Sequence, residues 1–187
     1  MYQKIKKRSG ITLIELLISA LLFSAIIAAA VLMLSTGLKI WSSGKDRLDI
    51  RQNGNLAMER MVRYLETSNY NSPVGVSVAA ANNTTFYADT DNNGTVEAVT
   101  LTYDAVNKRI NITIGAGGTA LILSPDVQSL AFSYYDNSGP SVLLSPLPLN
   151  KDQRDSISVI NISLTMSKGN DTVTLNSSAF CRNQVVI

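Results

Sequence analysis

The longest apolar run of the chain lies near its N-terminus. Residues 11–34 are apolar almost throughout, and Glu15 is the single charged residue among them. Roughly 20 apolar residues are enough for a helix to span the hydrocarbon core of a bilayer. The pattern therefore predicts a membrane-spanning helix over residues 11–36. A carboxylate at mid-membrane costs about 2.5 kcal/mol or more of insertion free energy, so we expect Glu15 to have a partner.

Beyond residue 36 the pattern changes to that of an amphipathic helix. Charged residues are interspersed with apolar ones at helical spacing, among them Leu48, Leu56, Met61, Val62 and Leu65. This spacing predicts that the helix continues over residues 37–68 and offers one face for packing. Gly37, Gly44 and Gly54 each weaken a helix by about 1 kcal/mol relative to alanine. Two outcomes stay open, a kink or local melting near Gly37–Gly44 and a continuous helix held by tertiary contacts.

Residues 69–187 have the sequence pattern of a β-rich domain. Ile110, Ile112 and Ile114 alternate with polar residues, as in a half-buried strand. Residues 96–103 and 108–114 are predicted to form a hairpin, residues 127–135 a strand, and residues 156–166 and 172–175 a second hairpin. One long helix packed on a mainly antiparallel sheet is an α+β arrangement.

The charge distribution predicts topology rather than a nucleic-acid partner. The net charge is +2, and four of the sixteen basic residues lie within residues 1–10. A nucleic-acid surface needs clustered Lys and Arg, which the rest of the chain lacks. Basic residues beside a membrane span favour the cytoplasmic side. We therefore expect a single-pass protein whose N-terminus is cytoplasmic and whose β-rich domain is exported.

The content of histidine and cysteine limits the chemistry. Histidine is absent and Cys181 is the single cysteine. Serine–histidine and cysteine–histidine catalysis are therefore excluded, and a zinc site is disfavoured. A membrane-anchored enzyme would have to use a carboxylate pair, for which Asp89 and Asp91 are the close candidates. We expect a protein that is not an enzyme, in which Cys181 is a small buried side chain.

The small pair Ser9–Gly10 stands between the basic run and the apolar run, whereas a secretory signal has its cleavage site after the apolar run. Residues 9–16 resemble the processing site of type IV prepilins and type II secretion pseudopilins. The resemblance implies that prepilin peptidase cuts between Gly10 and Ile11 and methylates Ile11, so that residues 1–10 are a cleaved leader. Ile11 departs from the family, which more often has Phe or Met there. The alternative is an uncleaved signal anchor.

Cleavage would create an amine at Ile11 about one helical turn from Glu15. A nearby ammonium favours the charged form of a carboxylate in lipid. The resemblance implies that Glu15 meets the terminal amine of a neighbouring subunit during assembly. The alternative is that Glu15 lies at the interface, solvated by headgroups, with no partner.

Two segments in the β-rich part, residues 130–139 and 175–183, resemble segments of J-type minor pseudopilins and W-type minor pilins. The tryptophan-rich and charged loop segments of those members are missing here. The resemblance implies a minor pilin or pseudopilin of the bacterial inner membrane that helps initiate or cap a type IV pilus or a type II secretion pseudopilus. Its implied partners are other minor and major pilins or pseudopilins, prepilin peptidase, the inner-membrane assembly platform and membrane lipid. The alternative is an adhesin at a filament tip, with residues 139–151 as its contact surface.

Residues 89–94 match the opening of a calcium-binding loop of the EF-hand type. Oxygen ligands are expected at the first, third and fifth positions, and glycine at the sixth. The candidate calcium ligands are Asp89, Asp91, Asn93 and Glu97. The match is incomplete, because the twelfth position is Thr100 rather than glutamate. The alternative is a polar turn, since Asp, Asn and Gly favour turns without any ion.

Overall fold

The computed structural model describes residues 12–68, 75–136 and 142–181. The chain divides into two compact units, Met1–Gly44 and Lys45–Ile187, and each is described by itself. The helix α1, Leu13–Glu66, contributes to both units. It ends two residues before the predicted boundary at residue 68. Its backbone is helical through Gly37, Gly44 and Gly54 without interruption, so the local melting that the glycines allow is not seen.

In the first unit α1 is apolar on all sides and uncovered. Every residue from 12 to 44 is exposed, and the mean hydropathy of its most apolar window is 2.7. By length and composition this is the one helix among the described residues that could cross a membrane. A helix that is apolar all round is stable only when lipid or other protein covers it.

In the second unit α1 buries one stripe. The buried residues recur at helical spacing: Ile50, Gly54, Ala57, Met58, Met61 and Leu65. The predicted amphipathic helix is therefore confirmed, but its predicted face is partly wrong. Leu48 is 69% exposed and Leu56 points outward as well, because the stripe that meets the sheets runs through Ile50 and Ala57 instead.

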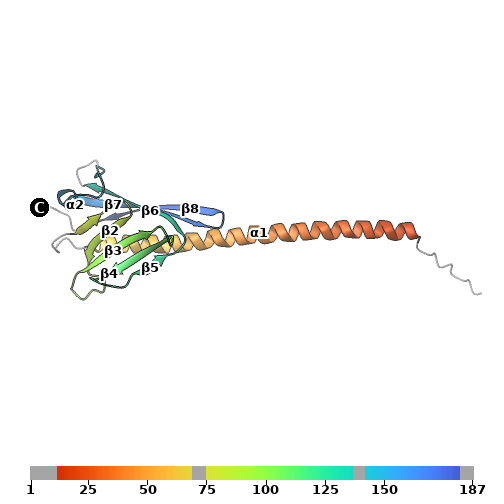
Figure 1. The fold of residues 1–187 in the computed structure, drawn as a ribbon, viewed down its shortest axis with the longest axis horizontal. Coiled ribbons are helices and arrows are strands. Elements are labelled where there is room, and N and C mark those ends of the chain that lie inside the picture. Colours follow the sequence, from red (N-terminus) through yellow and green to blue (C-terminus); the bar gives the residue numbers. More distant parts are fainter. Residues whose placement is uncertain (1–11, 69–74, 137–141, 182–187) are drawn as a thin grey trace, which may run out of the picture. The chain divides into compact units, whose positions relative to one another are not determined.

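The predicted antiparallel architecture is confirmed, and it is divided between two sheets (Figure 1). The first sheet is a five-stranded meander in chain order: β1 Val76–Ala79, β2 Asn83–Ala88, β3 Glu97–Asp104, β4 Arg109–Ile114 and β5 Leu121–Ser124. The predicted hairpin is β3–β4, whose ends pair at Asp104 and Arg109.

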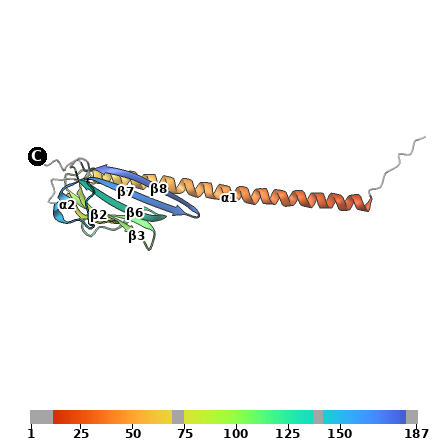
Figure 2. The same ribbon diagram turned by 90° about the horizontal axis from the view of Figure 1, so that it is seen from above.

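The second sheet has three strands, which lie side by side in Figures 1 and 2. They are β6 Val127–Asp136, β7 Ile157–Lys168 and β8 Asp171–Phe180, with the short helix α2, Lys151–Asp155, before β7. The second predicted hairpin is β7–β8. One hydrophobic core joins the inner faces of both sheets with the buried stripe of α1. Its largest side chains include Phe86, Phe132, Tyr134, Met61 and Leu65.

Gly54 is the point of closest approach between α1 and the second sheet. A Cβ atom at this position would lie 2.6 Å from both Leu175 Cδ1 and Met166 Sδ. At Gly37 and Gly44 the same atom would meet nothing within 4 Å. The absence of a side chain at Gly54 therefore lets Met166 and Leu175 pack directly on the helix.

A charged contact joins the end of the β7–β8 hairpin to α1. Lys168 Nζ lies 3.0 Å from Asp49 Oδ2 and 3.5 Å from Asp46 Oδ1. The hydrogen bond to Asp49 is the main cause that raises the pKa of Lys168. The hairpin is thus held on the helix by charge at its end and by packing around Gly54.

The outer face of the second sheet carries no charged side chain along residues 129–135, 159–167 and 172–180. Facing residues form cross-strand rows of hydroxyl and amide groups, such as Ser133–Asn161–Ser178 and Ser129–Thr165–Thr174. A shallow hollow of about 260 Å³ lies on this face and is lined mainly by serine and asparagine.

The β3–β4 turn contains a carboxylate that the fold stabilises in its charged form. The side-chain amide of Asn107 donates to Asp104 at 2.7 Å, and the Asn107 N–H and Arg109 Nε donate at 3.0 and 3.2 Å. These bonds, led by that from the Asn107 side chain, lower the pKa of Asp104. A lowered folded pKa means that this stabilisation is present at neutral pH and is lost as the pH falls through the folded pKa.

We expect Asp104→Asn to lower the melting temperature at pH 7. The difference from the parent should shrink as the pH falls and vanish below the folded pKa of Asp104. The parent side chain is then protonated and neutral, like the asparagine of the variant. Thermal unfolding of both proteins across an acid pH series measures this. A difference that stays constant with pH would show that charge at this position has no role.

Candidate functional site

The N-terminus of α1 is closed by a reciprocal pair of residues. The Thr12 N–H and the Thr12 hydroxyl donate to Glu15 Oε2 at 2.8 and 2.9 Å, and the Glu15 N–H lies 3.3 Å from Thr12 Oγ1. This is a capping box, in which a threonine before the helix and a glutamate three residues later satisfy each other's backbone groups. The Thr-x-x-Glu spacing was visible in the sequence, but our interpretation of Glu15 did not use it.

The capping box explains how Glu15 is accommodated at this end of an apolar helix. The first N–H groups of a helix have no partner within it, and the helix dipole favours negative charge there. The carboxylate of Glu15 is therefore held at the start of α1, beside Thr12, which directly follows Ile11. Gly10 and Ile11 lie outside the described residues, so cleavage and methylation there stay predictions, as does the role of Glu15 in assembly.

Three serine hydroxyl groups within the apolar part of α1 bond to the helix itself. Ser19 donates to the Glu15 carbonyl at 2.7 Å, Ser24 to Leu21 at 2.8 Å, and Ser35 to Leu32 at 2.9 Å. A polar group in hydrocarbon must find its partner within the protein. These three serines therefore meet the requirement for polar groups in lipid, and the apolar helix suggests membrane anchoring.

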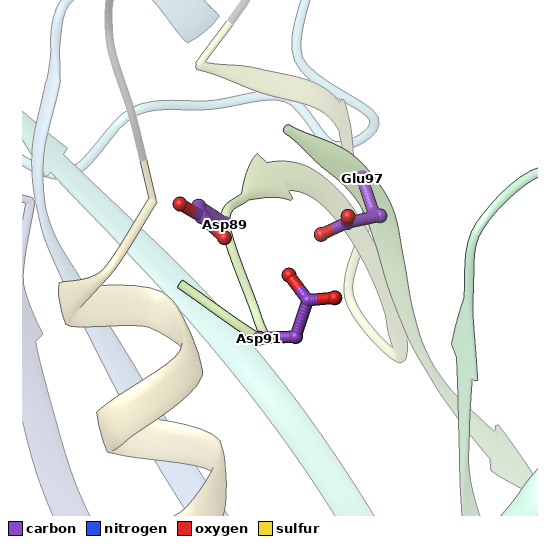
Figure 3. A group of neighbouring side chains, drawn as sticks. All are labelled: Asp89, Asp91 and Glu97. Carbon is purple, nitrogen blue, oxygen red and sulfur yellow. The ribbon is translucent and has the colours of Figure 1, made fainter. Parts of the chain in front are cut away.

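A second candidate site lies in the loop between β2 and β3. Asp89, Asp91 and Glu97 direct their carboxylates toward a common space (Figure 3), with one oxygen of each within 4.8 Å of the others. Asn92 and Gly94 have positive φ angles, which produce the tight turn that brings Asp89 and Asp91 back toward β3. The structure thus brings together three of the four predicted calcium ligands.

The fourth predicted ligand, Asn93, is directed elsewhere. Its amide oxygen accepts hydrogen bonds from the Thr95 N–H, at 2.7 Å, and from the Thr95 hydroxyl. Its amide nitrogen donates to Asp91 at 2.7 Å. Thr100 lies within β3 and bonds to Thr85, so the loop closes at Glu97, its ninth position, and not at its twelfth.

The donor set of this loop fits a hard cation. Three carboxylates provide the oxygen ligands that Ca²⁺ prefers, and like charges this close favour a cation between them. Some of these carboxylate oxygens already accept hydrogen bonds within the loop. Asp89 accepts from the Asn93 and Gly94 N–H groups at 3.1 and 2.9 Å, and Glu97 accepts from the Thr90 N–H at 3.1 Å.

Cys181 is a buried side chain, as predicted. Burial raises the pKa of its thiol to about 11. The reactive thiolate is therefore scarce near neutral pH.

The similarity of this chain to a known protein family concerns its N-terminal part. Residues 5–31 match the family model described as the prokaryotic N-terminal methylation motif. No curated protein matches the chain. The motif supports the type IV pilin and pseudopilin family, with processing by prepilin peptidase and assembly with other pilins. It suggests a structural subunit rather than an enzyme.

Proposed function

We propose that this chain is a minor pilin or pseudopilin that helps initiate or cap a type IV pilus or a type II secretion pseudopilus. The observation that carries the proposal is the methylation motif directly joined to an uncovered apolar helix. Such a helix needs lipid before assembly and the helices of other subunits after it. The leader is cytoplasmic, and the β-rich domain lies on the outer side of the inner membrane.

The proposed mechanism centres on Glu15. Removal of residues 1–10 leaves an ammonium at Ile11, one residue before the Thr12 group that Glu15 already contacts. In the membrane this amine can neutralise Glu15 of its own chain. In the filament the amine of a neighbouring subunit takes that place, and opposite charges in a low dielectric fix the register of the two helices.

The experiment that tests this proposal is the intact mass and N-terminal sequence of the protein from cells with and without prepilin peptidase. We expect a chain that starts at methylated Ile11 when the peptidase is present. In the peptidase mutant the chain should start at Met1. A chain that starts at Met1 in both strains would overturn the proposal and favour an uncleaved signal anchor.

We propose in addition that the β2–β3 loop binds calcium through Asp89, Asp91 and Glu97. The support is the convergence of their carboxylates. Bound cation would remove the repulsion among them and stabilise the folded state by mass action. Asn93 would take part only after its amide turns away from Thr95, so we expect a site with few protein ligands and weak affinity.

Addition of millimolar Ca²⁺ is expected to raise the melting temperature of the full chain in detergent, and Asp91→Asn should remove most of this rise. The variant keeps the size of the side chain and removes one of three ligating charges. Asp126→Asn, which changes a carboxylate outside the loop, is the matched control. Equal rises in all three proteins, or no rise in the parent, would contradict a calcium site in this loop.

A further inference from the structure

A groove in the second unit lies between the last turns of α1 and one edge of the five-stranded sheet. Its volume is about 630 Å³. One wall comes from α1 and the other from the last two strands of the sheet. The lining residues that matter here are Arg60 and Arg63 on α1, Ile112 and Ile114 on β4, and Leu121 and Ile122 on β5.

The sheet wall of this groove includes β5, which lies at the edge of the five-stranded sheet. Among the described residues β5 pairs with β4 alone, so its other edge leaves backbone groups without strand partners (Figure 1). The strand reads Leu-Ile-Leu-Ser, and its Leu121 and Ile122 are 60% and 57% exposed. Proteins usually protect such edges with lysine, proline or a covering segment. None of these protections is present in β5 itself.

The helix wall of the groove is basic. Arg60 and Arg63 are one turn apart, both are exposed, and neither forms an ion pair with another described residue. The neighbouring strand β4 adds the apolar side chains of Ile112 and Ile114 to the lining. The groove therefore combines an open strand edge, apolar side chains and two positive charges that have no ion-pair partner among the described residues.

We propose that this groove receives an extended acidic segment of a neighbouring filament subunit, which adds to β5 as a sixth strand. The inference rests on the proposed function for the identity of the neighbour. In β-strand addition, backbone hydrogen bonds supply affinity and alternate side chains supply specificity. Side chains on the inner face of the added strand would point toward α1, where a carboxylate can bond to Arg60 or Arg63. Side chains on the outer face would be apolar and pack beside Ile122.

Charge and hydrogen bonding together select this occupant. An anionic lipid could satisfy the arginines, but its acyl chains cannot bond to the open edge of β5. A basic or neutral strand could satisfy the edge, but it would leave both guanidinium groups uncompensated. An acidic strand satisfies both walls at once.

The test uses the full-length chain in zwitterionic detergent micelles, with labelled isoleucine and leucine methyl groups observed by NMR. The probe is the capped peptide Thr-Val-Glu-Val-Glu-Val-Thr, and its matched control has lysine in place of glutamate. We expect saturable shifts of the methyl groups of Leu121, Ile122 and Ile114. Binding of the lysine peptide should be at least tenfold weaker. A third peptide, methylated on alternate backbone nitrogens, should not bind, because it cannot pair with β5.

Charge reversal provides the decisive variant. Arg60→Glu with Arg63→Glu should invert the preference, so that the lysine peptide binds at least tenfold better than the glutamate peptide. The same reversal at Arg47 and Arg51, which are exposed on α1 outside the groove lining, should leave the preference unchanged.

The proposal is overturned if the acidic peptide shifts no groove methyl group, if both peptides bind equally, or if the reversal at Arg60 and Arg63 changes nothing. It is also overturned if phosphatidylglycerol added to the micelles saturates the groove and blocks the peptide, or if the groove methyl groups shift with protein concentration alone. These readouts do not depend on leader cleavage, so failure here is distinct from failure of the proposed processing.

Discussion

Replacement of Glu15 by glutamine is expected to reduce the amount of this subunit in assembled filaments at least tenfold. Glutamine keeps the length of the side chain and can still complete the capping box with Thr12, so the start of α1 should be preserved. What is lost is the negative charge that we propose meets the amine of a neighbouring subunit. A tenfold change needs only about 1.4 kcal/mol, which an ion pair in a low dielectric readily exceeds.

The measurement is the fraction of the protein recovered with sheared filaments, together with the intact mass of the membrane-bound form. Mass is needed because Glu15→Gln must still be cleaved and methylated for the result to concern assembly. Thr12→Val is the matched control, since it removes the hydroxyl that bonds to Glu15 and leaves the charge of Glu15 in place. We expect this variant to assemble. If Thr12→Val fails as severely as Glu15→Gln, the structure at the start of α1 limits assembly and the loss in Glu15→Gln is not specific to the charge of Glu15.

Gly54→Leu is expected to destabilise the second unit by about 1–2 kcal/mol. Overpacking of a filled core costs about 1–3 kcal/mol, occasionally more, and here even the first added carbon would lie 2.6 Å from Met166 and Leu175. The removal of a helical glycine returns about 1 kcal/mol. Because the added branches must displace two side chains, the cost exceeds the gain. Thermal unfolding in detergent should show a melting temperature lower by roughly 2–8 °C.

The other two glycines of α1 provide the contrast. Gly37→Ala and Gly44→Ala add a methyl group where nothing lies within 4 Å, so only the gain in helix propensity remains. Helix content in detergent should be unchanged or slightly higher in both variants. Destabilisation by Gly44→Ala as large as that by Gly54→Leu would show that packing at Gly54 is not the cause.

The sequence predicted the elements whose periodicity is strong and missed those defined by their neighbours. The helix followed from its long apolar run and its helical spacing, and both hairpins followed from their strand patterns and the turn residues between them. The strands β1, β2 and β5 did not, because they are short and β2 is largely polar outside Phe86. The buried face of α1 was only partly predicted, because small residues such as Gly54 and Ala57 form it where the second sheet comes close.

The candidate site divides in the same way. Glu15 was identified because a charge in an apolar run is conspicuous, and its bond to Thr12 is a local contact that spacing could have revealed. The loop motif likewise predicted that Asp89, Asp91 and Glu97 lie close together. The groove beside β5 was not, since Arg60 and Leu121 are far apart along the chain and only tertiary packing brings their elements together.

The uncharged outer face of the second sheet has a consequence for how fast partners can meet this protein. An approaching molecule gains no long-range attraction from rows of serine, threonine and asparagine. Encounters at that face should proceed at the unsteered rate of about 10⁵–10⁶ M⁻¹s⁻¹ and respond little to ionic strength. Encounters guided by Arg60 and Arg63 should slow as salt shortens the Debye length to about 8 Å at physiological strength. The salt dependence of an association rate therefore reports which side of the domain a partner reaches first.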